Sequence, residues 1–319
     1  MDGKKVLVTG VGGDIGQSLL KCLKDIGYEF SLLGCDIDPL AGGRALVEKF
    51  YQAPYATDTE SYLRFVTGLL KSENIEYVFP TSEAEIEFFD VNRNLFENKT
   101  TVFIHNQDIV KVFLDKYETA LLLARKGLPC PRTYLVEQYN NELDYPCILK
   151  PRKGHGGKSL ILANDPEEFK FFRKRLKNYI VQENIGSPDE EYTVTVFSTG
   201  KEFYSIAFKR SLGYGSLSKV AQLVQDSKLE SLAEKVAAAV SLEGSLNIQC
   251  RKINSGFIPF EVNPRFSSTV YVRHYFGFQD VKWWVDLREG KPIEYKPRFK
   301  SGTCVRTISE TFFDLESWD

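Results

Sequence analysis

The sequence has few of the features that mark a secreted, membrane-spanning or metal-scaffold protein. Its six cysteines lie far apart and form no close pair of the kind found in zinc or redox motifs, so we interpret them as reduced thiols. The beginning of the chain leads directly into a short apolar segment that is too brief for a signal peptide or a membrane span. An internal repeat and a low-complexity tract are also missing. These absences predict a globular protein of the cytoplasm.

The chain also lacks an excess of charge of either sign. The formal net charge of -2 creates no overall field that would attract nucleic acid or an anionic membrane surface, so we expect neither as a partner. Any anion-binding site must therefore be local. The composition, with 43% apolar and 26% charged residues, is ordinary for a folded protein. Because 319 residues exceed what one hydrophobic core usually serves, we expect two or three units around one cleft.

Residues 1–113 have the pattern of an α/β unit. Short apolar segments alternate with helical patterns, which is typical of a parallel sheet flanked by helices. The helix that follows the first strand is predicted to begin at Asp14, as its N-cap, and to end at Gly27. The strands are predicted at 6–9, 32–37, 77–80 and 102–104.

A second unit is predicted to begin at Asp115, which with Glu118 has the spacing of a capping box. The following segment indicates a small α+β lobe, and the chain becomes rich in strands after Pro188. The predicted domains are 1–113, 114–186 and 187–319. The small lobe is predicted to contain strands at 147–150, 160–163 and 179–182 and a helix at 166–177. The last part is predicted to contain a hairpin of 192–197 and 203–208, a helix at 229–240, and strands at 246–250, 257–262 and 303–308.

A glycine-rich turn, Thr-Gly-Val-Gly-Gly-Asp-Ile-Gly at 9–16, connects the first strand to the first helix. Asp36 follows about twenty residues later, as in dinucleotide-binding folds. The other interpretation is that these glycines only permit close packing of strand and helix. A reductase or epimerase of the short-chain type would also need a tyrosine with a lysine four residues later, and none of the 16 tyrosines has one. An NAD(P)-dependent enzyme is therefore kept as an alternative function.

A second glycine-rich segment, at 146–158, combines an apolar strand with a basic loop. The strand leads to Lys150, and the loop contains Gly154, Gly156, Gly157 and Lys158. Glycines allow backbone N–H groups to approach phosphate oxygens, and lysines supply positive charge, which is what binding a nucleoside triphosphate requires. A basic surface turn is the alternative interpretation of the same residues.

A third group of polar residues lies on two late strands. Gln249 lies on one strand, and Glu261 and Asn263 lie two positions apart, and therefore on one face, of the next. A few carboxylate and amide oxygens together with phosphate oxygens are what Mg²⁺ prefers. The alternative is that these are polar strand ends exposed to water.

Together, these segments resemble the ATP-grasp superfamily, in particular the single-unit relatives of the carbamoyl-phosphate synthetase large subunit, over nearly the whole chain. The resemblance implies a mixed α/β and α+β fold, in which a Rossmann-like pre-ATP-grasp domain precedes a two-lobed ATP-grasp fold with ATP between its lobes. Carbamoyl-phosphate synthesis itself is not expected, because that family couples two ATP-grasp units and this chain has one.

The resemblance also implies roles for individual residues around ATP. Lys116 and Lys150, with the loop Gly154, Gly156, Gly157 and Lys158, would contact the phosphates. The adenine would meet the run of Gln182, Glu183, Asn184 and Ile185, and the ribose would meet Glu191, with Glu190 as the alternative.

Further roles concern the metal and the reaction. Two Mg²⁺ ions, or Mn²⁺ in their place, would be held by Gln249, Glu261 and Asn263. Arg265 would stabilise the transferring phosphate, so the predicted catalytic residues are Arg265, Lys150 and Glu261. The carboxylate substrate would meet Lys209, Arg210 and Arg273.

The function predicted from these features is that of an ATP- and Mg²⁺-dependent ligase. It would convert a carboxylate into an acyl phosphate, release ADP and join the acyl group to an amine or another nucleophile. The predicted partners are therefore small-molecule carboxylates and amines. Besides the NAD(P)-dependent enzyme, a protein that senses ATP without ligating anything is a further alternative. The aromatic residues around Trp283 and Trp284 are interpreted as core or dimer packing, which leaves a homodimer open.

Overall fold

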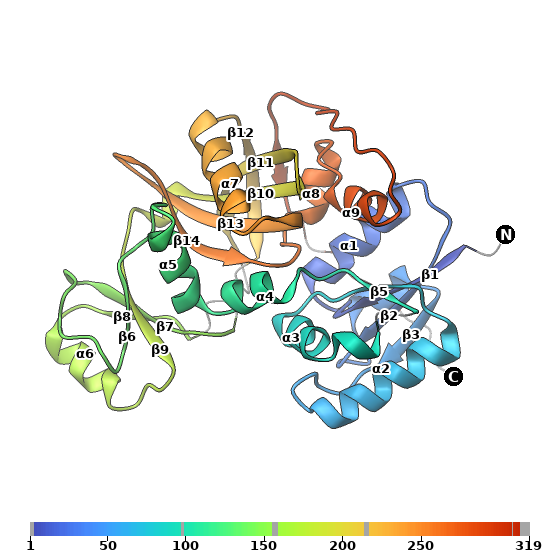
Figure 1. Cartoon of the computed structure of the whole chain (residues 1–319), viewed down its shortest axis with the longest axis horizontal. Helices are drawn as coiled ribbons and strands as arrows, with labels where there is room; N and C mark the ends of the chain where they lie inside the picture. Colours follow the sequence, from blue (N-terminus) through green and yellow to red (C-terminus); the bar gives the residue numbers. More distant parts are fainter. Residues whose placement is uncertain (1–2, 97–98, 155–158, 214–216, 308, 313–319) are drawn as a thin grey trace. The chain divides into compact units, whose positions relative to one another are not determined.

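The structure is a computed structural model that describes the chain except for residues 1–2, 97–98, 155–158, 214–216, 308 and 313–319 (Figure 1). The chain divides into two compact units. The first comprises Met1–Asn106, Arg265–Phe299 and Val305–Asp319, and the second comprises Gln107–Pro264 and Lys300–Cys304. The predicted succession of domains at 1–113, 114–186 and 187–319 stays a prediction. The first compact unit combines the beginning of the chain with most of the residues after Pro264.

The first unit is built around a five-stranded parallel sheet in the order β3-β2-β1-β4-β5. Four of its strands match predicted segments to within two residues. The remaining strand, β3, lies at the sheet edge and is half exposed, so its sequence Lys-Phe-Tyr-Gln gives little apolar signal. The strands are β1 (Lys4–Thr9), β2 (Phe30–Asp36), β3 (Lys49–Gln52), β4 (Tyr77–Phe79) and β5 (Thr101–Val102).

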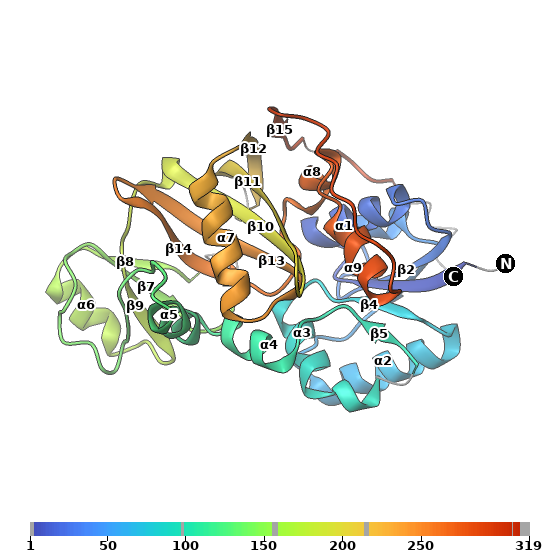
Figure 2. The same cartoon turned by 45° about the horizontal axis from the view of Figure 1, so that its top comes forward.

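Helices cover both faces of this sheet. Figures 1 and 2 show α1, α8 and α9 on one face and α2 and α3 on the other. Trp283 and Trp284 are buried at 2% and 1% exposure, which confirms the core interpretation for these two residues. The helices are α1 (Asp14–Asp25), α2 (Thr59–Glu73), α3 (Glu83–Val91), α8 (Val270–Tyr275) and α9 (Asp280–Arg288), with 3-10 turns η1 (Gly42–Leu46) and η2 (Arg93–Leu95).

The N-cap predicted for α1 is wrong by one residue. Gly13 occupies the cap position with an extended backbone and makes no side-chain capping bond, and Asp14 is the first helical residue. The carboxylate of Asp14 therefore lies in the first turn, where a negative charge interacts favourably with the helix dipole.

The second unit contains a small antiparallel sheet in the order β6-β9-β7-β8. Its core includes Tyr139, Leu149, Phe169 and Val181. The helix predicted at 166–177 is shorter in the structure, because its regular turns end before the polar residues that follow Arg173. The elements are α5 (Lys116–Arg125), β6 (Thr133–Leu135), β7 (Cys147–Pro151), β8 (Ile161–Ala163), α6 (Pro166–Arg173) and β9 (Tyr179–Glu183).

A larger antiparallel sheet of the second unit has the order β14-β13-β10-β11-β12-β15, and the predicted hairpin of β10 and β11 is confirmed. One face carries apolar residues such as Val194 and Ile248, which pack with Val236 of α7. The opposite face carries the polar residues, because side chains alternate along each strand. The elements are α4 (Gln107–Phe113), η3 (Pro188–Glu190), β10 (Glu191–Thr199), β11 (Phe203–Leu212), β12 (Ser218–Val224), α7 (Ser227–Ala239), β13 (Glu243–Ile253), β14 (Gly256–Asn263) and β15 (Thr303–Val305).

Among the helices that the structure describes, none has both the length and the apolar character that crossing a membrane would need.

Candidate active site

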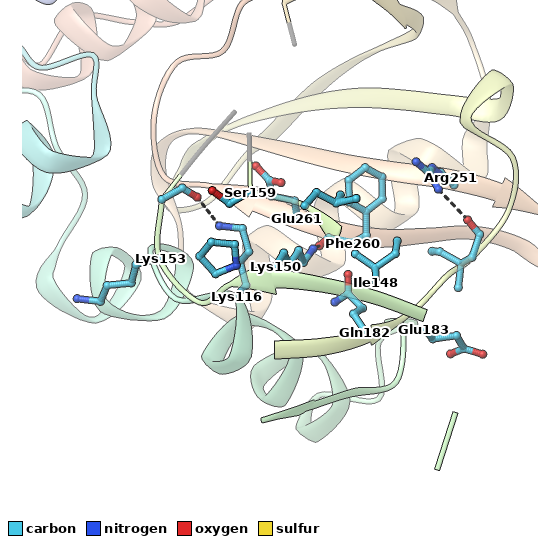
Figure 3. A pocket seen from close by; sticks show the side chains of 14 residues that line it. Lys116, Ile148, Lys150, Lys153, Ser159, Gln182, Glu183, Arg251, Phe260 and Glu261 are labelled. Atoms are coloured by element: carbon cyan, nitrogen blue, oxygen red, sulfur yellow. Dashed lines mark hydrogen bonds between the residues drawn. The ribbon is translucent and has the colours of Figure 1, made fainter. Parts of the chain in front are cut away.

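A pocket of about 250 Å³ lies within the second unit, between strands β7 and β9 of the small sheet and strands β13 and β14 of the large one (Figure 3). It brings together Lys150 and Glu261, on which the predicted nucleotide site depends. Its walls contain both basic and apolar side chains. The lining residues are Lys116, Ile148, Lys150, Pro151, Lys153, Gly154, Ser159, Leu160, Gln182, Glu183, Ile185, Arg251, Phe260 and Glu261.

Lys150 is the most buried basic residue of this pocket, with 7% of its surface exposed. Alternation along β7 sends Cys147 and Leu149 to the core and leaves Ile148 and Lys150 facing the pocket. The Lys150 ammonium donates a hydrogen bond to the Phe260 carbonyl at 3.2 Å. Burial lowers the pKa of Lys150 to about 8, against the opposing effect of the Glu261 carboxylate. A bound anion would therefore raise this pKa again.

Lys116 reaches the same pocket from the first turn of α5. The helix begins at the N-cap Asp115, whose carboxylate accepts hydrogen bonds from backbone N–H groups of the first turn. The Asp115 N–H donates to the Val112 carbonyl, so the N-cap half of the predicted capping box is the part that is confirmed. The Asp115 carboxylate also pairs with Arg152, whose Nε lies 3.1 Å away, and the Lys116 N–H donates to the Arg152 carbonyl at 2.9 Å. The Lys116 ammonium itself donates to the Gly154 carbonyl. These bonds fix the start of α5 beside the end of β7.

Apolar side chains form the other part of the pocket wall. Ile148, Leu160, Ile185 and Phe260 line it, and they suit a flat aromatic ring better than a charged group. The Phe260 ring lies 5.8 Å from the Lys150 ammonium and 5.4 Å from the Arg251 guanidinium. An apolar wall with lysines beside it suits a ligand that combines a flat ring with anionic groups.

The predicted adenine-binding run is only partly at the pocket. Gln182, Glu183 and Ile185 line it, whereas Asn184 is exposed and lies outside the set of lining residues. Gln182 Nε2 donates to Thr133 Oγ1 at 2.9 Å.

The Glu183 carboxylate has a partner of its own. It accepts a hydrogen bond from the Arg132 backbone N–H at 3.0 Å. The Glu183 backbone N–H in turn donates to the Arg132 carbonyl at 2.9 Å, so the adenine contact stays a prediction.

The predicted metal ligands meet at Glu261. Gln249 lies directly opposite Glu261 in the sheet, and its Nε2 is 3.5 Å from Glu261 Oε1. Asn263 Nδ2 donates to the same oxygen at 3.0 Å. The Oε1 of Gln249 already accepts a hydrogen bond from Arg210 at 2.7 Å.

This donor set fits a magnesium ion in part. The Glu261 carboxylate is a suitable ligand, and rotation of the Asn263 amide would present its oxygen in place of its nitrogen. Gln249 fits less well, because the oxygen it would supply is bonded to a cation. The described residues contain no group of three or more His, Cys, Asp or Glu side chains that could hold a metal. A cation here would therefore depend on phosphate oxygens for most of its ligands.

Glu191, the predicted ribose ligand, does not line the pocket. It is 5% exposed, and its carboxylate lies between two guanidinium groups. Arg210 donates to its Oε1 and Arg251 to its Oε2. The ribose contact stays a prediction, and the alternative residue, Glu190, pairs with Lys209.

The predicted substrate residues are engaged elsewhere. Lys209 pairs with Glu190, and Arg210 pairs with Glu191. Neither Lys209 nor Arg210 lines the pocket, and Arg273 does not line it either. Arg273 belongs to the first unit, where it is 0% exposed and forms an ion pair with Asp280. Its structural role differs from the substrate contact that we predicted, because a buried guanidinium needs a buried counter-charge.

Arg265 and the basic loop remain predictions. Arg265 also belongs to the first unit, where its guanidinium lies 3.5 Å from Glu83 and donates to the Phe266 carbonyl at 3.1 Å. Of the predicted loop, Gly154 lines the pocket. Gly156, Gly157 and Lys158 lie outside the described residues.

Sequence reasoning missed Arg251 and Phe260. Arg251 follows Gln249 by two positions on β13 and so shares its face, a signal that could have revealed it. Phe260 precedes Glu261, so strict alternation would place the two on opposite faces. In the pairing of β13 with β14, Gln249 lies opposite Glu261 and Cys250 lies opposite Pro259, so Phe260 is an extra residue that interrupts the alternation along β14. Phe260 and Glu261 therefore both line the pocket.

The glycine-rich turn of the first unit is explained by packing. Gly10 has a φ of +59°, and a Cβ on Gly16 would lie 2.4 Å from the Gly10 carbonyl oxygen. Asp36 accepts a hydrogen bond from the Gly12 N–H at 2.7 Å. The carboxylate that would bind a ribose in a dinucleotide site therefore closes the turn.

Residues 113–269 match the family model of the ATP-grasp domain, a range that includes Lys150, Glu261 and the rest of the pocket. The chain contains an ATP-grasp domain. The predicted superfamily and the mixed fold, with an α/β unit before the ATP-grasp part, are thereby confirmed.

A curated protein with a similar sequence is the 5-formaminoimidazole-4-carboxamide-1-(beta)-D-ribofuranosyl 5'-monophosphate synthetase of Pyrobaculum islandicum. It is 27% identical over 187 residues, which cover 58% of this chain and 52% of the relative. The chain thus spans about half the length of the curated relatives it matches.

Solved structures show the same fold. An ADP complex of purK, an N5-carboxyaminoimidazole ribonucleotide synthetase, superposes with a TM-score of 0.76 at 16% identity, covering 96% of this chain and 82% of the other. The biotin carboxylase domain of the Hydrogenobacter thermophilus 2-oxoglutarate carboxylase has a TM-score of 0.73 at 16% identity, covering 93% of this chain and 72% of that one. Its structure contains MgADP and bicarbonate.

Proposed function

We propose that this protein is an ATP- and Mg²⁺-dependent ligase that activates a carboxylate as an acyl phosphate and transfers the acyl group to an amine. The observation that carries the proposal is the meeting of Lys150, Lys116 and Glu261 in one pocket of the ATP-grasp domain. The similarity to the 5'-monophosphate synthetase, and to solved structures that contain ADP or MgADP, supports it.

In this proposal the pocket binds ATP with its base against the apolar wall of Ile148, Ile185 and Phe260. The phosphates extend toward the ammonium groups of Lys150 and Lys116, which neutralise their charge. Because Lys150 is buried, its interaction with a phosphate is screened little by water.

Glu261 and Asn263 would hold Mg²⁺, which would draw charge away from the phosphate oxygens as the reaction proceeds. The Glu261 carboxylate accepts hydrogen bonds from the amide groups of Asn263 and Gln249. These neighbours keep the carboxylate pointing in one direction before a ligand arrives.

The reaction begins when a carboxylate oxygen attacks the γ-phosphorus of ATP. The bond from this phosphorus to the bridging oxygen breaks, and ADP leaves as an acyl phosphate forms. An amine then attacks the acyl carbon, inorganic phosphate departs, and the nitrogen loses a proton. The lysines contribute position and charge rather than covalent chemistry.

Calorimetry with MgADP and a turnover assay test the proposal together. We expect MgADP to bind the protein, and ADP release from MgATP to depend on an added carboxylic acid when pools of acids and amines are supplied. Stabilisation by NADH and not by MgADP in a thermal-shift assay would overturn the proposal in favour of an oxidoreductase. MgADP binding without ADP release in any pool would overturn it in favour of a nucleotide sensor.

A further inference from the structure

One end of the nucleotide pocket is held by a partly buried arginine. Arg251, which lines the pocket, donates from Nη1 to the carbonyl of Ile185 at 3.2 Å (Figure 3). Its Nε and Nη2 each lie 3.3 Å from Oε2 of Glu191. Glu191 therefore fixes the side chain that in turn fixes the backbone beside the apolar wall.

The same carboxylate is connected to the acidic end of the pocket. Arg210 donates to Glu191 Oε1 from Nε at 3.1 Å and from Nη2 at 2.7 Å. The Nη2 of Arg210 also donates to Gln249 Oε1 at 2.7 Å. Gln249 Nε2 then reaches Glu261 at 3.5 Å. A continuous series of hydrogen bonds thus joins the base end of the pocket to the predicted metal ligand.

The four N–H donors around Glu191 use its whole acceptor capacity. A carboxylate has about four lone-pair sites, two on each oxygen. Arg210 occupies Oε1 with two donors and Arg251 occupies Oε2 with two. A ribose hydroxyl could bind Glu191 only by displacing one of these bonds, and Glu191 lies outside the pocket lining.

Glu191 also balances the charge of the two arginines. Its single carboxylate compensates two guanidinium groups whose side chains are 7% and 17% exposed. Without the negative charge, Arg210 and Arg251 would repel each other in a site with little water. Both arginines therefore depend on Glu191 for their position.

We propose that Glu191 is a positioning residue rather than a ribose ligand. Through Arg251 it holds the Ile185 carbonyl at the base end, and through Arg210 and Gln249 it orients the Glu261 carboxylate at the metal end. This inference rests on the proposed function, because it concerns the binding of MgADP and MgATP. It predicts that one substitution outside the pocket lining disturbs both ends of the site.

The first experiment measures binding of MgADP, Mg-2′-deoxy-ADP and Mg-3′-deoxy-ADP by calorimetry to the wild type and to Glu191→Gln. Glutamine places an N–H group against one arginine and removes the charge, so we expect MgADP affinity to fall at least tenfold. The preference for ADP over the deoxy analogues should equal that of the wild type. Loss of that preference in the variant would show a direct ribose contact and overturn the proposal. An unchanged MgADP affinity with a lowered Tm would reduce Glu191 to a structural role and overturn it as well.

Two further carboxylate variants provide controls. Glu191→Asp keeps the charge and all lone pairs, and we expect it to recover part of the affinity that Glu191→Gln loses. Glu202→Gln removes an exposed carboxylate at the β10–β11 hairpin of the same sheet, and should leave MgADP affinity within twofold of the wild type. A loss in Glu202→Gln as large as that in Glu191→Gln would contradict a specific role of the buried carboxylate.

The second experiment tests separately the two connections of Glu191, through Arg210 to the metal end and through Arg251 to the base end. Arg210→Met breaks the connection to Gln249 and Glu261, so it should weaken binding of MgADP more than binding of ADP in EDTA. Arg251→Met acts at the base end and should weaken both by the same factor. Equal losses for both forms of ADP in Arg210→Met would overturn the connection to the metal end.

If wild-type protein fails to bind MgADP at all, the proposed function fails. Normal wild-type binding together with unaffected variants would remove this inference alone.

Discussion

Two buried arginine clusters in this molecule are built from the same groups but differ in their charge balance. In the first unit, Arg273 faces one carboxylate, that of Asp280, at 2.9 and 2.7 Å, and also donates to Ser267 at 2.9 Å. The pair is neutral, and Arg273 is 0% exposed. In the second unit, two arginines share the one carboxylate of Glu191.

The difference separates a structural ion pair from one that belongs to a binding site. The Glu191 cluster retains a positive charge beside a pocket that also contains Lys116 and Lys150. Burial and the nearby Lys116 and Arg251 all lower the pKa of Lys150, to about 8. Uncompensated positive charge around a cavity is what an anionic ligand requires. The neutral Arg273 cluster offers nothing of this kind.

The largest effect is expected when the neutral cluster is broken. Arg273→Met leaves Asp280 buried without a counter-charge, which should lower the free energy of unfolding by about 3–5 kcal/mol. Denaturant unfolding measures this change, and MgADP affinity of the remaining folded protein should stay that of the wild type. The double variant Arg273→Met/Asp280→Leu should recover part of the stability. A loss of MgADP affinity with little loss of stability would show that Arg273 belongs to the binding site.

Glu261→Gln should act on the reaction. Removal of the carboxylate that would hold Mg²⁺ is expected to lower acid-dependent ADP release by roughly 10²–10³-fold, the size found when electrostatic groups are removed from other active sites. A coupled assay for ADP measures the rate. Glu202→Gln, on the exposed hairpin of the same sheet, is the matched control and should have the wild-type rate. Full activity of Glu261→Gln would eliminate this residue as a metal ligand.

Lys150→Met should weaken MgADP binding. The substitution keeps the aliphatic part of the side chain but removes a charged donor, which is expected to cost about 1.5–3 kcal/mol of binding free energy. Calorimetry measures the difference against Lys170→Met, in which an exposed lysine of α6 is replaced in the same way. Equal affinities of the two variants would contradict a phosphate contact by Lys150.

The smallest effect concerns pH. In the free protein the pKa of Lys150 is lowered to about 8, and a bound phosphate raises it, so the protonated form binds better. Affinity for MgADP should be greatest well below pH 8 and fall by up to about tenfold per pH unit above it, until the pH reaches the raised pKa of the bound form. Calorimetry at pH 8 in buffers of different ionisation enthalpy should also reveal proton uptake. Lys150→Met should abolish the pH dependence, and a slope that survives in this variant would assign it to another group.

Much of the architecture could be predicted because it depends on local pattern. The first strand, the hairpin around Gly200 and the helix after Asp115 follow from alternation, turn residues and capping, all of which are visible over a few positions. The meeting of Lys150 and Glu261 was reached through the family resemblance, since neither residue's neighbours indicate the other.

The rest depends on pairings that short-range patterns do not contain. A register shift in the sheet brings Phe260 to the pocket beside Glu261, and this shift arises from two strands together. Likewise, no spacing indicates that Glu191 will be occupied by arginines from two other strands, or that Arg273 will find Asp280 in a closed core. Polar residues of the candidate site could therefore be identified from the sequence more easily than the residues with which they form ion pairs.

The junction at Asp115 has a mechanical consequence for the two lysines. Because this residue caps the helix that bears Lys116 and also pairs with Arg152 directly after the strand that bears Lys150, the backbone segments that carry the two lysines are held together. Leu123 of the same helix packs in the core of the large sheet, so the junction also connects the small sheet to the large one. The backbone positions of both lysines are set when the chain folds, and only their side-chain torsions are left for a ligand to adjust.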